Sequence, residues 1–241
     1  MSTDIFFTKE NLDNALRTLG KEYRRLNGKS MPAEIILIGG AAVLANYGFR
    51  DMTYDIDAVI QAASSMKDAI NTVGDSLGLP NGWLNSDFIH TKSYSPKLTQ
   101  YSVYYKTFSN VLTVRTISGE YLVAMKLMSG RQYKNDISDI IGILHEQKEK
   151  EKPIAMSDID RAVTNLYGDW HNMPEEARQL AESILASDNL EKLYQQYRNE
   201  EKSNKEALIK FEKDYPGVTK EDNLKDIVAN LKARKNKNRE R

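Results

Sequence analysis

Apolar residues in the first half of the chain follow two different periods. After Thr8, a suitable N-cap, they recur at helical spacing as far as Gly28. Further along, short apolar or alternating runs bounded by turn residues are typical of strands; these runs cover residues 33–38, 55–60, 101–107 and 111–117. Helical patterns lie between several of these runs. The chain is therefore predicted to form a mixed α/β (α+β) domain with a small sheet flanked by helices.

The second half of the chain has helical patterns alone. No strand pattern follows Ile117, and glutamate and lysine dominate from Asn189 to the end. The change in character falls near Pro153. We therefore predict two domains: an α/β domain over residues 1–152 and an all-helical C-terminal region over residues 153–241.

Composition narrows the chemistry that the chain can support. Among its 241 residues there is no cysteine, which excludes disulfides and thiolate metal sites, and its three histidines are far apart in sequence. A metal bound here is therefore expected to be a hard cation on carboxylates. The amino terminus has no basic region followed by a long apolar run, so we expect no signal peptide, no membrane partner and a cytoplasmic protein.

Charge is balanced overall but unevenly placed. The chain has 34 basic and 34 acidic residues, yet its last ten residues carry six lysines and arginines against Glu240 alone. A basic tail can contact nucleic acid through the phosphate backbone. A solubilising chain end explains the same composition and is the simpler interpretation.

Two carboxylates stand two residues apart in the predicted strand 55–60. Side chains at this spacing point to the same face of a strand, about 7 Å apart, so Asp55 and Asp57 form one acidic pair. Such a pair can hold one or two Mg²⁺ or Mn²⁺ ions, which bridge the oxygens of a triphosphate. Taken alone, the pair is better explained as an exposed sheet face with two solvated acids.

A pair of glycines gives the acidic pair a second signal. Gly39 and Gly40 lie between a predicted buried strand and a short predicted helix. Glycine lets the backbone approach a phosphate closely and adopt positive φ, and free N–H groups at a helix start can face an anion. A tight strand–helix turn is the alternative. Together with Asp55 and Asp57, the glycines predict anion-binding donors beside metal ligands.

A charged group follows on the predicted helix from 119 to about 130. Lys126 lies among apolar residues, where burial of a cation is costly unless it is paired with phosphate or with carboxylates; the alternative is that it reaches the surface. Arg131 is able to hold phosphate as a planar fork, or to pair with Asp136 or Asp139. These two acids are three apart and share one helix face, where Asp136 also suits a local first-turn position.

Two segments together resemble the nucleotidyltransferase superfamily. The first motif consists of residues 37–42, 48–50 and 53–59, and the second of residues 122–128 with Arg131, Asp136 and Asp139. In order and spacing they are similar to bacterial nucleotidyltransferase-like proteins that include the toxins of abortive-infection, type IV toxin–antitoxin systems. The resemblance spans residues 37–139 and does not extend to the helical remainder.

The resemblance implies an activity and a set of site residues. It implies a sheet of the nucleotidyltransferase type and Mg²⁺-dependent transfer of a nucleoside monophosphate from a triphosphate to an acceptor hydroxyl on RNA, such as a tRNA end, or on a protein. It also implies a toxin in phage defence, with a cognate antitoxin protein as partner. The implied catalytic residues are Asp55, Asp57, Lys126 and Asp136, of which Asp55 and Asp57 hold the metal. The implied nucleotide-binding residues are Gly39, Gly40, Lys126 and Arg131.

The chain departs from the superfamily pattern at one position. Many members carry a third catalytic acid on a later strand, and neither 101–107 nor 111–117 contains one. Asp87 precedes these strands in a predicted loop and is a poor substitute. Either Asp136 fills part of that role from its helix, or the chain is a catalytically degenerate module that binds a nucleotide, RNA or a partner protein.

Overall fold

The computed structural model describes residues 6–220, 223–224 and 226–231. Within them the chain forms two compact units. The first contains Met1–Met125 and Ser157–Asn172, and the second contains Lys126–Met156 and Met173–Arg241. A domain boundary at residue 152 stays a prediction, and the basic tail at 232–241 lies outside the described residues.

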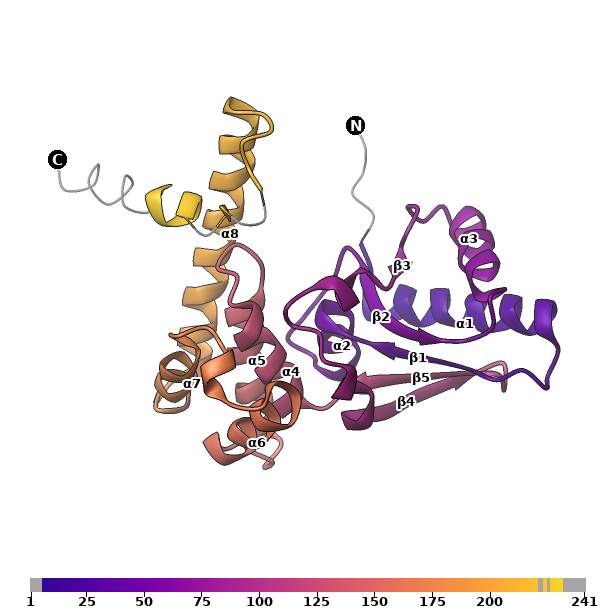
Figure 1. The fold of residues 1–241 in the computed structure, drawn as a ribbon, viewed down its shortest axis with the longest axis horizontal. Helices are drawn as coiled ribbons and strands as arrows, with labels where there is room; N and C mark the ends of the chain where they lie inside the picture. The colour runs from indigo at the N-terminus through magenta and orange to yellow at the C-terminus, as the bar shows by residue number, and fades with distance from the viewer. Residues whose placement is uncertain (1–5, 221–222, 225, 232–241) are drawn as a thin grey trace. The chain divides into compact units, whose positions relative to one another are not determined.

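A five-stranded mixed sheet forms the centre of the first unit (Figure 1). Its order is β3-β2-β1-β5-β4. The strands are β1 (Ala33–Leu37), β2 (Ile56–Gln61), β3 (Leu84–Asn85), β4 (Ser102–Phe108) and β5 (Leu112–Ile117). Central β1 pairs antiparallel with β2 and parallel with β5. The predicted fold class, a small mixed sheet with flanking helices and a helical C-terminal region, is confirmed.

The register of three strands brings several chain segments to one edge of the sheet. Leu37, the last residue of β1, is paired with Ala58 near the start of β2. One residue later, the Ile38 N–H donates to the carbonyl oxygen of Asp57 at 2.9 Å. Because β5 runs parallel to β1, its carboxyl end lies at this edge too. The end of β1, the start of β2 and the end of β5 therefore lie together.

The first unit also contains several helices. They are α1 (Lys9–Asn27), α2 (Gly39–Asn46), α3 (Met66–Leu77), the first part of α4 (Gly119–Ser129) and α6 (Met156–Tyr167), with short 3-10 helices at Asp87–His90, Pro96–Tyr101 and Trp170–Asn172. Thr8 caps α1 in a reciprocal capping box with Asn11, as its sequence predicts for an N-cap. Within α1, Gly20 is required because a Cβ there would lie 2.9 Å from Phe108 Cβ.

The second unit is helical and is built around α5. It contains the end of α4 together with α5 (Asp136–Glu149), α7 (Ala177–Leu185) and α8 (Leu190–Asp214). Helix α5 packs along α8 (Figure 1). Every residue of α5 from 136 to 144 is buried, polar ones included. Among the described residues, no helix is long and apolar enough to cross a membrane.

Candidate functional site

The glycine turn connects β1 to α2 at the shared sheet edge. Helix α2 begins at Gly39, whose φ of +55° lies in the left-handed region that favours glycine. Its N-cap is Ile38, which has no side-chain acceptor for the first N–H groups of the helix. The turn thus leaves the helix start without a side-chain cap, as an anion-binding turn requires.

The structure brings the glycine turn and one of the two predicted metal ligands together. A Cβ added at Gly39 would lie 3.6 Å from Asp57 Oδ2. Ile56 is fully buried while its neighbours Asp55 and Asp57 are exposed and half-buried, so the predicted alternation of faces is observed. Asp55 directly precedes β2, which begins one residue later than the predicted strand. The carboxylate of Asp57 therefore lies against the start of α2.

Two further side chains at this turn were given no function by the sequence. A Cβ at Gly40 would lie 2.7 Å from Thr53 Oγ1 and 2.8 Å from an Nη atom of Arg50. The guanidinium of Arg50 also donates through Nε to the Met52 carbonyl oxygen at 3.1 Å. Gly40 is therefore needed for space, and Arg50 adds a cation beside the helix start. The position of Arg50 in the first motif was a sequence signal for a function. The sequence did not show that its side chain points toward Gly40.

Carboxylates at this edge suit a hard cation that also binds a triphosphate. In the described part of the chain, no three His, Asp or Glu side chains are grouped closely enough to hold a metal ion on their own. Mg²⁺ is commonly bound by one or two carboxylates, with phosphate oxygens and water completing its shell. The pair Asp55 and Asp57 fits that donor set, and its function as a metal site stays a prediction.

The third strand at the edge ends without a carboxylate. The Thr116 hydroxyl of β5 donates to Asn46 Oδ1 at 2.8 Å, and Asn46 Nδ2 donates to the Ile117 carbonyl oxygen at 2.9 Å. The next acid along the chain is Glu120, in the first turn of α4, which accepts a hydrogen bond from the Ser118 hydroxyl at 2.9 Å. β5 therefore carries no acid, and the polar side chain near its end, Thr116, is bonded to Asn46.

A second charged cluster lies in the helical unit. Lys126 Nζ is 2.8 Å from Asp136 Oδ1 and 2.8 Å from Asp139 Oδ2. Lys126 is 7% exposed and the two acids are 0% and 1% exposed. The alternative in which Lys126 reaches the surface is therefore wrong: it is a buried cation with two carboxylate partners. Asp139, which the sequence left open, belongs to this cluster as closely as Asp136 does.

Arg131 completes the cluster from the loop between α4 and α5. Its Nε is 2.8 Å from Asp136 Oδ2, so of the two alternatives for Arg131 the structure shows the pairing with Asp136. Burial would raise the pKa of Asp136, but the charges of Lys126 and Arg131 outweigh burial and hold that pKa well below its usual range. The two cations therefore keep Asp136 ionised.

A residue that sequence analysis missed supports this cluster from α8. Glu201 is 2% exposed and accepts hydrogen bonds from the first turn of α5, including one from the Ile137 N–H at 2.8 Å. Burial raises the pKa of Glu201 to about 7, and the negative charge of Asp139 contributes in the same direction. No sequence signal marks Glu201, because it is one of many acids on a helix rich in glutamate and lysine.

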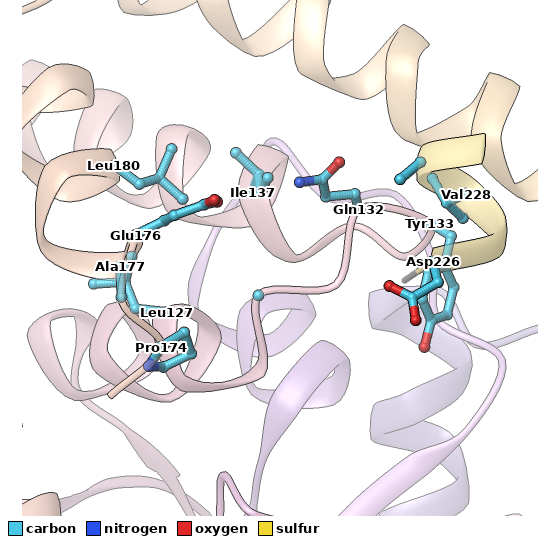
Figure 2. A pocket seen from close by; sticks show the side chains of 12 residues that line it. Leu127, Gln132, Tyr133, Ile137, Pro174, Glu176, Ala177, Leu180, Asp226 and Val228 are labelled. Atoms are coloured by element: carbon cyan, nitrogen blue, oxygen red, sulfur yellow. The ribbon is translucent and has the colours of Figure 1, made fainter. Parts of the chain in front are cut away.

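A cavity of about 270 Å³ lies beside the same loop (Figure 2). Its lining is mostly apolar, with the carboxylates of Glu176 and Asp226 at two sides. The lining residues are Leu127, Gly130, Gln132, Tyr133, Ile137, Pro174, Glu176, Ala177, Leu180, Asp226, Val228 and Ala229. Among the described residues that line it there are two acids and no basic side chain, a charge that does not favour a triphosphate.

Comparison with known proteins identifies a family. Residues 14–178 match a family described as nucleotidyltransferase of unknown function (DUF6036). The match includes the glycine turn, the acidic pair and the cluster around Lys126, and it ends before α8. No curated protein and no solved structure matches the chain.

Proposed function

The chain belongs to this nucleotidyltransferase family, and we propose that it is a Mg²⁺- or Mn²⁺-dependent enzyme that transfers a nucleoside monophosphate from a triphosphate to an acceptor hydroxyl. The observation that carries the proposal is the packing at the sheet edge, where Asp57 lies against Gly39 and Arg50 lies against Gly40. The carboxylate of Asp57 suits a metal ion, and the guanidinium of Arg50 and the free N–H groups at the start of α2 suit the phosphates of a metal-bound triphosphate.

Each group at the edge has a distinct part in the proposed reaction. Asp55 and Asp57 would hold the metal, which when bound stabilises the negative charge that develops on the phosphate oxygens. The N–H groups at the start of α2 and the guanidinium of Arg50 orient the phosphates and offset their charge. The acceptor oxygen forms a bond to the α-phosphorus, the bond to the β-phosphate oxygen breaks, pyrophosphate leaves, and the hydroxyl proton is released.

Lys126 and Arg131 form a second part of the proposal, which is tested separately. In the structure both cations are already paired with Asp136, and Lys126 also with Asp139. A triphosphate would compete with these carboxylates for the cations. We keep the sequence hypothesis that Lys126 and Arg131 contact the nucleotide and that Asp136 is catalytic; its support is that the family match over residues 14–178 includes these three residues.

A second candidate function is a binding module without transfer activity. The observation that favours it is the sequence of β4 and β5, which contain no acid, whereas many superfamily members carry a third catalytic acid on a later strand. Such a module would bind the nucleotide, an RNA or a partner protein through the same groups. A toxin activity with an antitoxin partner stays a prediction of the family resemblance.

Measurement of triphosphate binding tests whether the groups packed at the sheet edge form a binding site. Titration calorimetry with each nucleoside triphosphate, with and without Mg²⁺, should show metal-dependent binding to the wild type. Asp57→Ala should remove the metal dependence, whereas Asp51→Ala, an exposed acid six residues earlier, should not. Equal metal-dependent affinity of the Asp57→Ala variant and the wild type would rule out the assignment. Binding without transfer would favour the second candidate.

A further inference from the structure

Helix α8 presents two polar side chains to the interior of the helical unit. Its buried residues are Leu190, Glu201, Asn204 and Leu208. The last three follow one another at intervals of three and four, which places them on one helix face. Burying a glutamate and an asparagine costs free energy unless both side chains form hydrogen bonds. Their hydrogen-bond partners therefore indicate the function of this helix face.

Glu201 acts as the N-terminal cap of α5, although it is far away in sequence. Its Oε1 accepts from the Ile137 N–H at 2.8 Å and from the Ser138 N–H at 3.4 Å, and its Oε2 accepts from the Ser138 hydroxyl at 2.5 Å. The residue at the N-cap position, Asn135, makes no side-chain capping bond. Glu201 therefore supplies acceptors that a helix normally obtains from its own N-cap.

The capped turn is the one that carries the acids of the Lys126 cluster. Asp136 and Asp139 lie in this first turn and both contact Lys126 Nζ at 2.8 Å. Ile137 and Ser138, which Glu201 holds, are the two residues between them. Fixing these two residues fixes the backbone from which both carboxylates project.

A second contact from α8 holds the preceding loop. Asn204 Nδ2 donates to the Gln132 carbonyl oxygen at 2.7 Å. Gln132 directly follows Arg131, the remaining member of the cluster. Glu201 and Asn204 thus hold the segment that carries Arg131, Asp136 and Asp139 at two points.

From these contacts we infer that Glu201 is a positioning residue that fixes the first turn of α5 and thereby the geometry of the Lys126, Asp136 and Asp139 cluster. Because α8 lies beyond the residues 14–178 that match the family, the family assignment gives no function to this helix. Helix α8 thus contributes to the geometry of the Lys126 cluster. Only the kinetic part of its test rests on the proposed function.

The test compares two substitutions of Glu201 with a matched control. Glu201→Ala removes all three acceptor contacts, whereas Glu201→Gln retains one acceptor oxygen for the N–H groups of α5. Glu206→Ala removes an exposed acid from the same helix and serves as the control. If Glu201→Ala does not fold, Ser138→Ala takes its place: it removes the hydroxyl contact to Glu201 and a longer one of 3.5 Å to the Asn135 carbonyl oxygen, and it leaves both N–H contacts to Glu201.

The first measurement is independent of any activity. In the folded protein the Lys126 ammonium protons, buried between two carboxylates, should give a slowly exchanging ¹⁵N–¹H signal. Glu201→Ala, or Ser138→Ala to a smaller degree, should weaken or remove this signal, and Glu201→Gln and Glu206→Ala should retain it. An unchanged signal in a folded Glu201→Ala protein, or in Ser138→Ala where it is the substitute, would overturn the inference. So would equal loss in the alanine and glutamine variants of Glu201.

The second measurement follows nucleotidyl transfer. If the cluster takes part in the reaction, Glu201→Ala should lower kcat about tenfold with little change in KM for the triphosphate, and Glu201→Gln should restore most of it. Wild-type kcat in a Glu201→Ala protein that has lost the lysine signal would contradict the inferred link to the reaction. A wild type without transfer activity refutes the proposed function, while the lysine signal still decides whether Glu201 positions the cluster.

Discussion

Lys126 Nζ lies 2.8 Å from Asp136 Oδ1, and both residues are buried. A pair of this kind behaves differently from a surface ion pair, because removing one partner leaves the other as an uncompensated charge in the interior. Here the lysine has a second carboxylate partner in Asp139 and the aspartate a second cation in Arg131. The cluster is therefore expected to control the stability of the helical unit as well as any chemistry that it supports.

Substitution of Lys126 should destabilise the protein strongly. Lys126→Ala removes the cation that both buried carboxylates, Asp136 and Asp139, contact, and we expect a loss of about 3–5 kcal/mol in the free energy of unfolding. Lys202→Ala, an exposed lysine of α8, should change it by about 0.5 kcal/mol or less. Urea denaturation of both variants measures the difference. A loss at Lys126 as small as that at Lys202 would contradict the buried cluster.

Glycine at position 40 should be indispensable at the sheet edge. In Gly40→Ala the new methyl group would lie 2.7 Å from Thr53 Oγ1 and 2.8 Å from Arg50 Nη, so both side chains must move. Overpacking of this kind typically costs about 1–3 kcal/mol in stability. Triphosphate affinity should fall together with it, because Arg50 is displaced from the helix start.

The control for Gly40→Ala separates space from charge. Arg50→Lys keeps the positive charge but removes the planar fork, so it should weaken triphosphate binding without a comparable loss of stability. Calorimetric binding and thermal unfolding of the two variants, measured side by side, check both expectations. Wild-type affinity in Gly40→Ala would show that the packing at this turn is unrelated to ligand binding.

Glu201 should give the stability curve a recognisable dependence on pH. Its pKa is raised in the folded protein from 4.5 to about 7, so between these values the folded state binds more protons than the unfolded state. By linkage, this contribution to stability is fully present below about pH 4.5 and is lost as the pH rises to about 7. The loss amounts to at most about 3 kcal/mol.

The Glu201→Gln variant isolates that contribution. It has no titrating group at this position, so its stability relative to the wild type should improve as the pH is raised from about 5 to about 7.5. Asp136, whose pKa is lowered, affects stability only as the pH falls through and below its usual range, outside this window. Urea midpoints across the window provide the measurement, and a constant difference between the two proteins would show that Glu201 does not titrate there.

Local sequence patterns predicted one cluster better than the other. Gly39 follows β1 at the start of α2 and Asp57 lies 18 positions later in β2, and the strand–turn–helix pattern followed by an alternating acidic strand was sufficient to place them together. A cation among apolar residues needs a charged partner, so the sequence predicted a triphosphate or the catalytic acids for Lys126; its contact with Asp139 was not predicted. Arg50 was seen in the motif, but the direction of its side chain depends on loop backbone that no periodicity describes.

The contribution of α8 could not be predicted from local pattern. Glu201 lies 63 residues after Ser138, and its neighbours along the helix are other charged residues. A prediction that every acid of α8 is exposed to solvent is correct for most of these acids. Only the packing of α8 on α5 distinguishes the buried Glu201 from the exposed Glu206.

Transfer of label from α-³²P-labelled nucleoside triphosphates tests the central claim most directly. The wild type and Asp51→Asn should transfer label to an acceptor in total RNA, a tRNA pool or the protein itself, and release pyrophosphate in a reaction that requires Mg²⁺ or Mn²⁺. Asp57→Asn should remain folded and transfer about 100-fold less or nothing, because the metal loses a carboxylate ligand. Transfer by Asp57→Asn at the wild-type rate, or none by the wild type with any of the triphosphates and acceptors, would contradict the account.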